Sequence, residues 1–358
     1  MRILHISILN PVTHSRIFAK EAVAAARAGH AVYVLGAADP AHGAARSAYR
    51  HDGVVLWPHS RPQGVWQRIR LQLCLLYRLW RIRPRLVQLH SPELLPLALC
   101  ARWLLGCRLV YDQHEDYLAN LTHGAAYAPW YWPWVGQGIR LLEHLSVAWV
   151  DAAVQAEACY AGTLPHAQVV YVPNKALATP RPPGPARRAQ PPLRVLLSGT
   201  LAADWGVEAA LALVQAQPFA HSLTLAGHAP HPAYARQLEA TAARLPRVQL
   251  VGGQHYVPHS QLLACMASHD LGLALYSPQP AIATRIPTKF YEYMAAGLPF
   301  LYTDSPAWDA LNAQTGMGLA ISRLGELADF LARYRQPATR HWQWDAQPLL
   351  LLYQRLLA

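Results

Sequence analysis

Short apolar segments alternate with helical stretches along almost the whole chain, and this alternation limits the possible folds more than any other feature. Strands that alternate with helices form parallel sheets covered by helices on both faces. The predicted strands are RILHIS (2–7), AVYVLG (31–36), GVVLWP (53–58), LVQLH (86–90), RLVYDQHE (108–115), AAVQAE (152–157), VVYVPN (169–174), RVLLSG (194–199), SLTLAG (222–227), VQLVGG (248–253), LGLALYS (271–277) and PFLYTD (299–304). The sequence therefore predicts an α/β fold.

The alternation stops once, in the proline-rich stretch ATPRPPGPARRAQPPLR at residues 178–194. A basic, proline-rich stretch without periodicity is typical of an interdomain linker, and 358 residues exceed one ordinary core. We predict two doubly wound domains, at residues 1–177 and 194–340, with a linker at 178–193. A helical segment follows at 341–358. Open α/β sheets bind ligands outside the carboxyl ends of their strands, so a cleft between the two domains is expected to hold the substrate.

The composition favours a cytoplasmic protein. Hydrophobic residues make up 53% of the chain and charged residues 14%, which is typical of a globular protein. The five cysteines form no C-x-x-C pair, so reduced thiols are expected. No apolar run reaches the roughly 20 residues that span a bilayer, and MRILHISILN does not resemble a signal peptide. The 18 histidines form no motif with metal-ligand spacing, so no metal is predicted.

The net charge of +11 indicates an acidic partner, and the charge is concentrated in one part of the chain. Between Asp52 and Glu93 there is no acidic residue. The same segment contains seven arginines: Arg61, Arg68, Arg70, Arg78, Arg81, Arg83 and Arg85. Nucleic acid is not the predicted partner, because no zinc-finger, RNP-like or basic-zipper pattern accompanies this charge.

The helix predicted at residues 65–85 carries large apolar side chains among these arginines. They are Trp66, Ile69, Leu73, Leu76, Tyr77 and Trp80. One interpretation is a basic amphipathic helix that contacts anionic lipids, peripherally and on the inner face of the cell membrane. The other is an ordinary helix whose apolar stripe packs on its own sheet. The aromatic run APWYWPWV (128–135) is equally ambiguous, since it could contact sugars or a membrane or be buried between the domains.

The segment PTKFYEYMAAGLPFL (287–301) predicts a helix with an anion-binding start. Pro287 suits the first helical position, and Gly297 suits the left-handed residue after a helix of about three turns. Amides at the start of a helix attract anions, and Lys289 adds positive charge there. Glu292 follows at i+3, on a neighbouring face. A phosphate site with a carboxylate one turn away suits a nucleotide sugar.

These segments together resemble the family 4 glycosyltransferases, which are retaining enzymes of the GT-B fold that use nucleotide-sugar donors. The resemblance runs over nearly the whole chain. It is carried by HSRIFAKEA (14–22), HSPELLPLAL (90–99), YDQHEDY (111–117), LLEHLSVAWVDAAVQAEACY (141–160), VPN (172–174), LLSGTLAADWGVE (196–208), LTLAGHAP (223–230), VQLVGG and PTKFYEYMAAGLPFL. It implies two Rossmann-like domains facing a cleft, a C-terminal helix that crosses back to the first, and a donor held mainly by the second.

The resemblance also implies roles for individual residues. Glu292 matches the carboxylate that binds the ribose hydroxyls, and Lys289 is expected to bind the diphosphate. His114 matches the histidine that faces the donor sugar, so the predicted catalytic residues are His114, Lys289 and Glu292. The predicted donor-binding residues are Gly199, Thr200, Arg285, Pro287, Thr288, Lys289 and Glu292. The predicted acceptor-side residues are Arg16, His90 and His114. No metal and no cofactor besides the nucleotide-sugar substrate are expected.

Three positions depart from the family pattern. Thr284 replaces the first Glu of the family's Glu-x7-Glu motif, Trp205 replaces a basic residue before Gly206, and NPVTHSR lacks paired glycines. The main prediction is a metal-independent hexosyltransferase that acts on a glycan or lipid-linked acceptor in cell-surface polysaccharide or glycolipid synthesis. Two alternatives stay open: a weakly active or inactive nucleotide-sugar-binding scaffold of an envelope polysaccharide complex, and a sugar-nucleotide epimerase of the same fold.

Overall fold

The chain forms two compact units. The computed structural model describes residues 1–39, 47–118, 131–177, 190–278, 280–334 and 342–358. Unit 1 contains Met1–Asn174 and Asp345–Ala358, and unit 2 contains Lys175–Trp344. Most of the predicted linker, residues 178–189, lies outside the described residues, as does Trp130 of the aromatic run. Leu193, which the sequence placed in the linker, already belongs to the first strand of unit 2.

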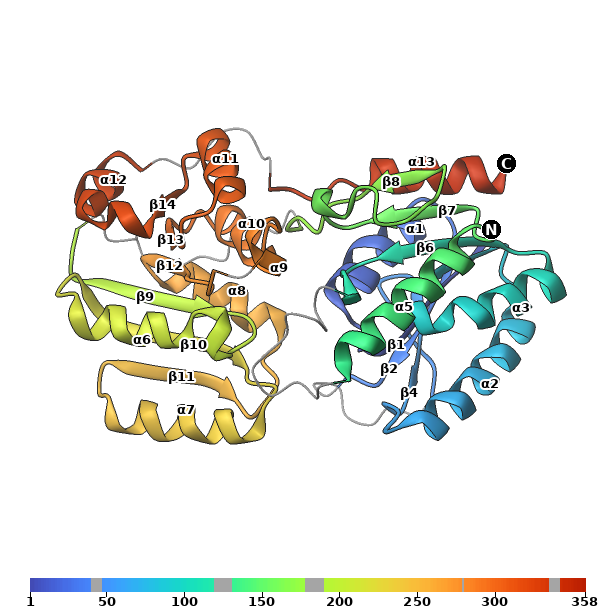
Figure 1. Ribbon diagram of the computed structural model, residues 1–358, viewed down its shortest axis with the longest axis horizontal. Helices are drawn as coiled ribbons and strands as arrows, with labels where there is room; N and C mark the ends of the chain where they lie inside the picture. Colours follow the sequence, from blue (N-terminus) through green and yellow to red (C-terminus); the bar gives the residue numbers. More distant parts are fainter. Residues whose placement is uncertain (40–46, 119–130, 178–189, 279, 335–341) are drawn as a thin grey trace. The chain divides into compact units, whose positions relative to one another are not determined.

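Unit 1 is built on an eight-stranded sheet with the order β3-β4-β2-β1-β5-β6-β7-β8 (Figure 1). The strands are β1 (Arg2–Pro11), β2 (Ala31–Ala37), β3 (Tyr49–His51), β4 (Val54–His59), β5 (Leu86–Leu89), β6 (Arg108–Gln113), β7 (Ala152–Gln155) and β8 (Val169–Tyr171). Only β3 is antiparallel to its neighbour. This strand was not predicted, although Asp52-Gly53, both with positive φ, is a hairpin signal.

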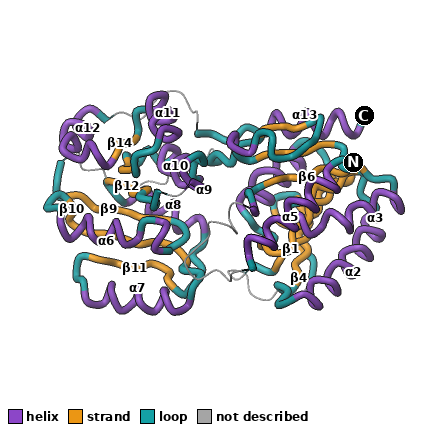
Figure 2. The backbone as a smooth tube through the Cα atoms, in the orientation of Figure 1, coloured by secondary structure: helices purple, strands orange, loops and turns teal. Residues whose placement is uncertain are grey.

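Helical segments connect these strands, and the last one joins them from the C-terminal end of the chain (Figure 2). They are η1 (Ser15–Ala22), α1 (Val23–Arg27), α2 (Val65–Ile82), η3 (Pro92–Leu94), α3 (Leu95–Leu105), α5 (Trp132–Val147), η4 (Ala158–Tyr160) and α13 (Gln347–Leu357). The helix predicted at 65–85 ends earlier, because Arg83 is left-handed and Pro84 follows it. The predicted return of the C-terminal helix is confirmed: α13 packs on unit 1, and the Tyr353 hydroxyl donates to the side-chain oxygen of Gln88.

Unit 2 has a six-stranded parallel sheet with the order β11-β10-β9-β12-β13-β14. Its strands are β9 (Leu193–Ser198), β10 (Ala220–His228), β11 (Val248–Gly253), β12 (Leu271–Ala274), β13 (Phe300–Tyr302) and β14 (Gly318–Ala320), the last of which was not predicted. Numbered within the unit, this is the Rossmann order 3-2-1-4-5-6. The predicted fold class, with two Rossmann-like domains, is confirmed.

The helical segments of unit 2 lie between these strands in the chain, except the last two, which follow the last strand, β14. They are η5 (Ala203–Trp205), α6 (Val207–Ala216), α7 (Pro232–Arg244), α8 (His259–Ser268), α9 (Pro280–Ala283), α10 (Thr288–Ala295), α11 (Pro306–Thr315), η6 (Ile321–Glu326) and α12 (Leu327–Arg333). The strand order reverses between β9 and β12, and such a switch point is where doubly wound sheets bind ligands. The sheet order of unit 2 therefore directs attention to the segments that follow β9 and β12.

Candidate functional site

The backbone is tightly packed at the switch point of unit 2. A β-carbon added to Gly227 would lie 1.6 Å from the carbonyl oxygen of Gly199, and one added to Gly206 would lie 2.1 Å from the carbonyl oxygen of Leu275. Both glycines also have positive φ angles. Glycine at these two positions lets the loops after β9, β10 and β12 approach one another at the carboxyl ends of the strands.

Helix α10 begins at this edge of the sheet, one residue later than predicted. Pro287 has an extended ψ of 137° and is the residue before the helix, so Thr288 is the first helical residue. The first amides of a helix have no intrahelical acceptor, and no side chain caps this end. The eight residues of α10 make about two turns, fewer than the three predicted. Gly297 follows with the expected positive φ of 60°.

Lys289 is buried, with an exposed fraction of 5%. Its Nζ has no hydrogen-bond partner among the described residues. The amine lies 4.8 Å from the centre of the Tyr276 ring, just beyond β12. Its Cε lies against Gly199, where an added β-carbon would be 3.9 Å away. Burial lowers the pKa of Lys289 to about 8. An anion bound here would restore the lost solvation of this amine.

Glu292 lies one turn after Lys289 on α10. Its Oε1 is 2.8 Å from Nε2 of His259 on α8, and its side chain is 16% exposed. Lys289 is its neighbour on the helix, but the side chain of Glu292 is hydrogen-bonded to His259. His259 was not predicted, because only the fold brings α8 beside α10. The carboxylate of Glu292 is therefore held in place and keeps partial access to solvent.

The two unusual residues of unit 2 are both exposed. Trp205 is 39% exposed, and its ring centre lies 5.8 Å from that of Tyr276, whose ring also contacts Lys289. Thr284 is exposed, between α9 and α10. The carbonyl of the next residue, Arg285, accepts a hydrogen bond of 2.7 Å from Nε1 of Trp308. Trp205, which replaces a cation of the family pattern, and Lys289 therefore contact the same ring, that of Tyr276.

In unit 1, Arg16 is the centre of a buried ion-pair network. It lies on η1, is 1% exposed, and donates from Nε and Nη2 to the two oxygens of Asp112 at 3.1 and 2.9 Å. Its Nη1 donates to the carbonyl of Val172 at 2.8 Å, and Nε is also 3.1 Å from Oε1 of Glu21. Burial alone would raise the pKa of Asp112, but Arg16 and His114 hold it well below its usual range.

Glu21 has the opposite electrostatic environment. Burial and the nearby Asp112 carboxylate raise the pKa of Glu21 well above its usual value, although Arg16 opposes this shift. Nε2 of Gln88 donates to Oε2 of Glu21 at 2.8 Å, and Gln88 is in turn bonded to Tyr353 of α13. The same buried environment therefore favours the carboxylate form of Asp112, paired with Arg16, and disfavours the charged form of Glu21.

Three histidines extend this network to the protein surface. Nδ1 of His5 is 3.1 Å from Nε2 of His90, whose Nδ1 lies 3.1 Å from Oδ2 of Asp112. Nε2 of His114 is 2.7 Å from the same Asp112 oxygen. His5 and His90 are buried, whereas the side chain of His114 is 10% exposed. Burial lowers the pKa of His90 to about 4, so it is neutral at pH 7.

We expect His90 to make unit 1 acid-sensitive. Its folded pKa of about 4 lies below the ordinary 6.5, so between these values the unfolded chain binds a proton that the folded chain does not. Stability then falls as pH falls through this window, by about 3 kcal/mol in total. Urea denaturation at a series of pH values measures this slope. The His90→Gln variant should show a flatter slope of stability against pH. The control variant His221→Gln, at an exposed site, should keep the wild-type slope. An unchanged slope in His90→Gln would contradict the assignment of the acid sensitivity to His90.

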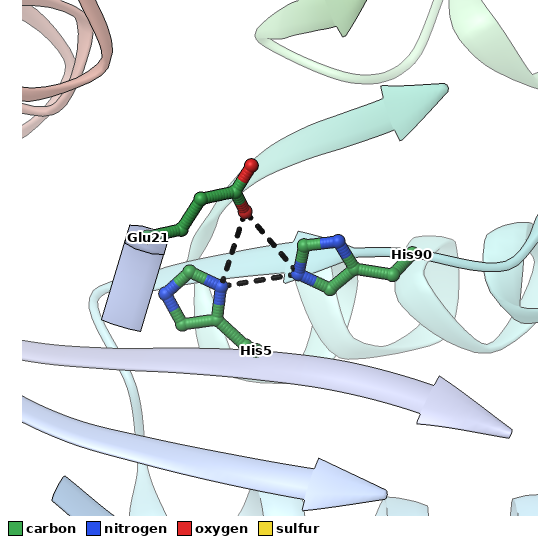
Figure 3. Close-up of side chains that lie close together, drawn as sticks. All are labelled: His5, Glu21 and His90. Atoms are coloured by element: carbon green, nitrogen blue, oxygen red, sulfur yellow. Dashed lines mark hydrogen bonds and ion pairs between the residues drawn. The ribbon is translucent and has the colours of Figure 1, made fainter. Parts of the chain in front are cut away.

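Two groups in unit 1 bring possible metal ligands together. Figure 3 shows His5, Glu21 and His90 turned toward one another, with ligand atoms 3.1 to 4.0 Å apart. The second group is His90, Asp112 and His114. The same atoms already contact each other, and Oε2 of Glu21 also accepts from Gln88. Sequence spacing missed these groups because His5 and His90 are 85 residues apart and meet only through the pairing of β1 with β5.

The structure separates the predicted residues into two sets. Gly199, Thr200, Arg285, Pro287, Thr288, Lys289 and Glu292 lie in unit 2, around the carboxyl end of β9 and the start of α10. Arg16, His90 and His114 lie in unit 1 and share Asp112. Of the latter three, Arg16 and His90 are about 1% exposed, so only His114 offers part of its ring to a ligand. Their roles in binding and transfer stay predictions.

Comparisons with known proteins agree with this geometry. Residues 194–334, which include β9, α10 and the switch point, match the family described as glycosyl transferases group 1. The second domain is a group 1 glycosyltransferase domain. The family resemblance inferred from the sequence is thereby confirmed. No curated protein matches the chain in a sequence search.

Solved structures show that the fold extends beyond the group 1 domain. Sucrose-phosphate synthase from Thermosynechococcus elongatus aligns over 100% of this chain and 99% of its own, with a TM-score of 0.72 and 15% identity. HepE from Anabaena, in complex with UDP and glucose, aligns over 100% of this chain and 99% of its own, with a TM-score of 0.68 and 13% identity. A putative UDP-N-acetylglucosamine 2-epimerase from Listeria monocytogenes aligns over 99% of this chain and 96% of its own, with a TM-score of 0.56 and 12% identity. At these identities the likeness establishes the GT-B fold alone.

Proposed function

We propose that the protein transfers a sugar from a nucleotide-diphosphate sugar to a glycan or lipid-linked acceptor, with retention of the anomeric configuration. The observation that carries this proposal is the buried amine of Lys289, which lacks a hydrogen-bond acceptor among the described residues and lies at the switch point beside the start of α10. A diphosphate is the group that suits a buried ammonium ion next to uncapped helix amides. UDP is the first nucleotide to test, because the structural relative HepE binds it.

Each residue has a role in this proposal. Lys289 and the first amides of α10 stabilise the negative charge that grows on the leaving diphosphate. Glu292, held by His259, accepts hydrogen bonds from the ribose hydroxyls. His114, fixed by Asp112 and His90, acts beside the reacting sugar. The leaving phosphate takes the proton of the acceptor, so no protein base is required.

Direct donor binding tests the proposal first. Thermal shift with UDP, GDP and their sugars separates a donor-binding protein from a scaffold without a nucleotide site. A ligand at 100 times its Kd adds about 2.7 kcal/mol of stability, which is measurable as a raised Tm. Release of free nucleotide only after a glycan or lipid-linked acceptor is added would then identify a transferase. If no nucleotide raises the Tm, the proposal fails.

Two other functions stay under test. Trp205 and Thr284 at the site favour a weakly active donor-binding scaffold, which would bind nucleotide sugar but release no nucleotide with any acceptor. An epimerase is the second, since one structural relative is a putative 2-epimerase. It would convert the sugar without an acceptor. In unit 1 Asp112 is committed to Arg16 and Asp116 is paired with Arg140, so these carboxylates are not available as a set of proton-transfer groups.

We expect transfer to continue in the presence of excess EDTA. The ammonium ion of Lys289 and the helix amides can neutralise the diphosphate without an ion. The measurement is the rate of nucleotide release with EDTA, with added Mg²⁺ and with added Zn²⁺. A loss of activity that an added ion restores would contradict metal independence. His5→Asn would then test whether the group of His5, Glu21 and His90 holds that ion.

We further propose that the acceptor is lipid-linked and that the protein works peripherally at the inner face of the cell membrane. None of the described helices is long and apolar enough to cross a bilayer. Membrane contact is supported by large apolar side chains that are exposed on the surface of unit 1.

A further inference from the structure

Helix α2 has two apolar faces. Its inner face places Leu75, Leu79 and Ile82 in the core of unit 1. Its other apolar face is a stripe of residues spaced by three and four positions, and this stripe is exposed. The exposed fractions are 81, 46, 65, 59 and 56% for Trp66, Ile69, Leu73, Tyr77 and Trp80. The interpretation that this stripe packs on its own sheet is wrong for these five residues. Only Leu76 of the predicted stripe packs against the core.

The neighbouring helices extend this apolar surface. Helix α3 packs against α2, and α5 packs against α3 (Figure 1). On α3 the exposed fractions of Trp103 and Leu104 are 78 and 70%, and α5 and its end expose further large side chains. We define the outer face as Trp66, Ile69, Leu73, Tyr77, Trp80, Trp103, Leu104, Leu141, Leu145 and Trp149. Exposed apolar surface of this extent marks an interaction site.

The charge on this surface has one sign. Arg70, Arg81 and Arg83 are exposed on or beside α2. Glu93 is the first acidic residue after Asp52, and it is paired with Arg68 at 2.6 Å. Helix α3 has no acidic residue, and the single one on α5, Glu143, is buried and accepts a hydrogen bond from Tyr111. Acidic side chains therefore do not offset the arginines of the outer face.

A basic hollow adjoins the outer face. Its volume is about 690 Å³, and its lining includes Trp103 and Trp149 together with Arg85, Arg102 and Arg108. Asp151 pairs with Arg102 and Arg108, at 2.5 and 2.9 Å. Arg85 is exposed at the rim, and the last residues of the chain, Leu356 to Ala358, complete the lining. Arginines next to tryptophans suit the phosphate of a lipid headgroup, with the acyl chains on the apolar side.

We propose that the outer face of unit 1 lies on the surface of an anionic lipid bilayer. Tryptophan and tyrosine favour the headgroup region, where an apolar ring can be buried while its polar atom stays hydrated. Each arginine near an anionic surface adds about 1 kcal/mol of attraction. The exposed arginines Arg70, Arg81 and Arg83 favour an anionic bilayer as the partner, because it offers negative charge over an extended surface. The proposal identifies the surface that would give the proposed peripheral location, and it does not depend on the proposed sugar transfer.

Vesicle flotation of the full chain tests this. With vesicles of phosphatidylcholine and phosphatidylglycerol we expect the protein to float with the lipid, and with phosphatidylcholine alone to bind far less. High salt should weaken the binding, since charge contributes to it. Failure to bind anionic vesicles even at low salt would overturn the proposal.

Matched variants separate the contributions. Arg70→Gln with Arg81→Gln should weaken binding to anionic vesicles by about 30-fold, at 1 kcal/mol for each charge. Arg236→Gln with Arg244→Gln removes two exposed arginines of unit 2 and should leave binding unchanged. Trp66→Ser with Leu73→Ser and Trp80→Ser should abolish flotation, whereas Tyr256→Ser, also exposed, should not. If both double arginine variants lose the same affinity for anionic vesicles, binding depends on the net charge of the protein alone, and the assignment to the outer face is wrong.

Two further readouts complete the test. The variants of the outer face should keep the wild-type Tm and bind UDP as the wild-type protein does, because this face includes neither the core residues of α2 nor any residue of unit 2. A concentration-dependent dimer that Trp66→Ser disperses, without vesicle binding, would instead make this face a contact between two copies and overturn the proposal. Nucleotide binding without lipid binding would leave the proposed sugar transfer standing and would remove the membrane inference together with the proposed peripheral location.

Discussion

Replacing Lys289 by methionine is expected to weaken the binding of UDP by about 10- to 100-fold, the value of one charge-assisted hydrogen bond. Methionine keeps the apolar stem beside Tyr276 but removes the amine, which is buried and has no hydrogen-bond partner among the described residues. The free energy of unfolding should therefore stay constant or rise, because a poorly solvated charge is lost. Isothermal titration calorimetry and urea denaturation measure the two quantities. Lower affinity with undiminished stability is the expected combination.

The same amine gives nucleotide binding a pH dependence. The pKa of Lys289 in the free protein is about 8, so above pH 8 the amine must take up a proton before it can pair with a phosphate. Affinity should then fall by about tenfold for each pH unit above 8, until the pKa of the complex is reached. The Lys289→Met variant should show no such slope.

Lys175 provides the matched control, since it is one of only three lysines in the chain and lies in the same unit. Lys175→Met makes the same chemical change at a half-exposed site, and it should preserve both the affinity for UDP and its slope with pH. If Lys289→Met binds UDP as tightly as Lys175→Met does, the diphosphate does not bind at α10 and the proposed function loses its main support.

The helix of the proposed donor site could be predicted from sequence because it is local. Pro287, Lys289, Glu292 and Gly297 lie on one short helix and its ends, and helix geometry alone fixes their relative positions. The error of one residue at Pro287 arose because proline suits both the first helical position and the position before it; ψ decides between them. The partner of Glu292 was not predictable, since His259 approaches only through the packing of α8.

The network of unit 1 is the opposite case. Arg16, Asp112 and Glu21 come from η1 and β6, and no spacing in the sequence relates these segments. Their only local signal was the occurrence of charged residues in segments that must be buried, which requires partners inside the core. Periodicity likewise predicted an apolar stripe on α2 but not its direction. Leucines at neighbouring helical positions, Leu75 and Leu79, occupy the core and leave the tryptophans outside.

Replacing Arg16 by methionine is expected to destabilise the protein by about 3 to 5 kcal/mol, the usual cost of leaving a buried charge without its partner. Arg16 is 1% exposed, and it is the cation that holds the pKa of Asp112 well below its usual range. Without it, the carboxylate of Asp112 stays buried beside Glu21 with much less compensation. Urea denaturation measures the loss. Hydrogen exchange should locate it in β1, β5 and β6, which carry the network.

A double variant separates the loss of the charge pair from the loss of packing. Arg16→Met with Asp112→Asn removes both charges, so at least half of the lost stability should return, because replacing a buried ion pair as a whole costs little. Arg323→Met breaks the exposed pair with Glu326 and should change stability little, since solvent screens that pair. If the double variant is less stable than Arg16→Met, Arg16 acts through its packing and its bond to Val172, and the charge of Asp112 is not what requires it.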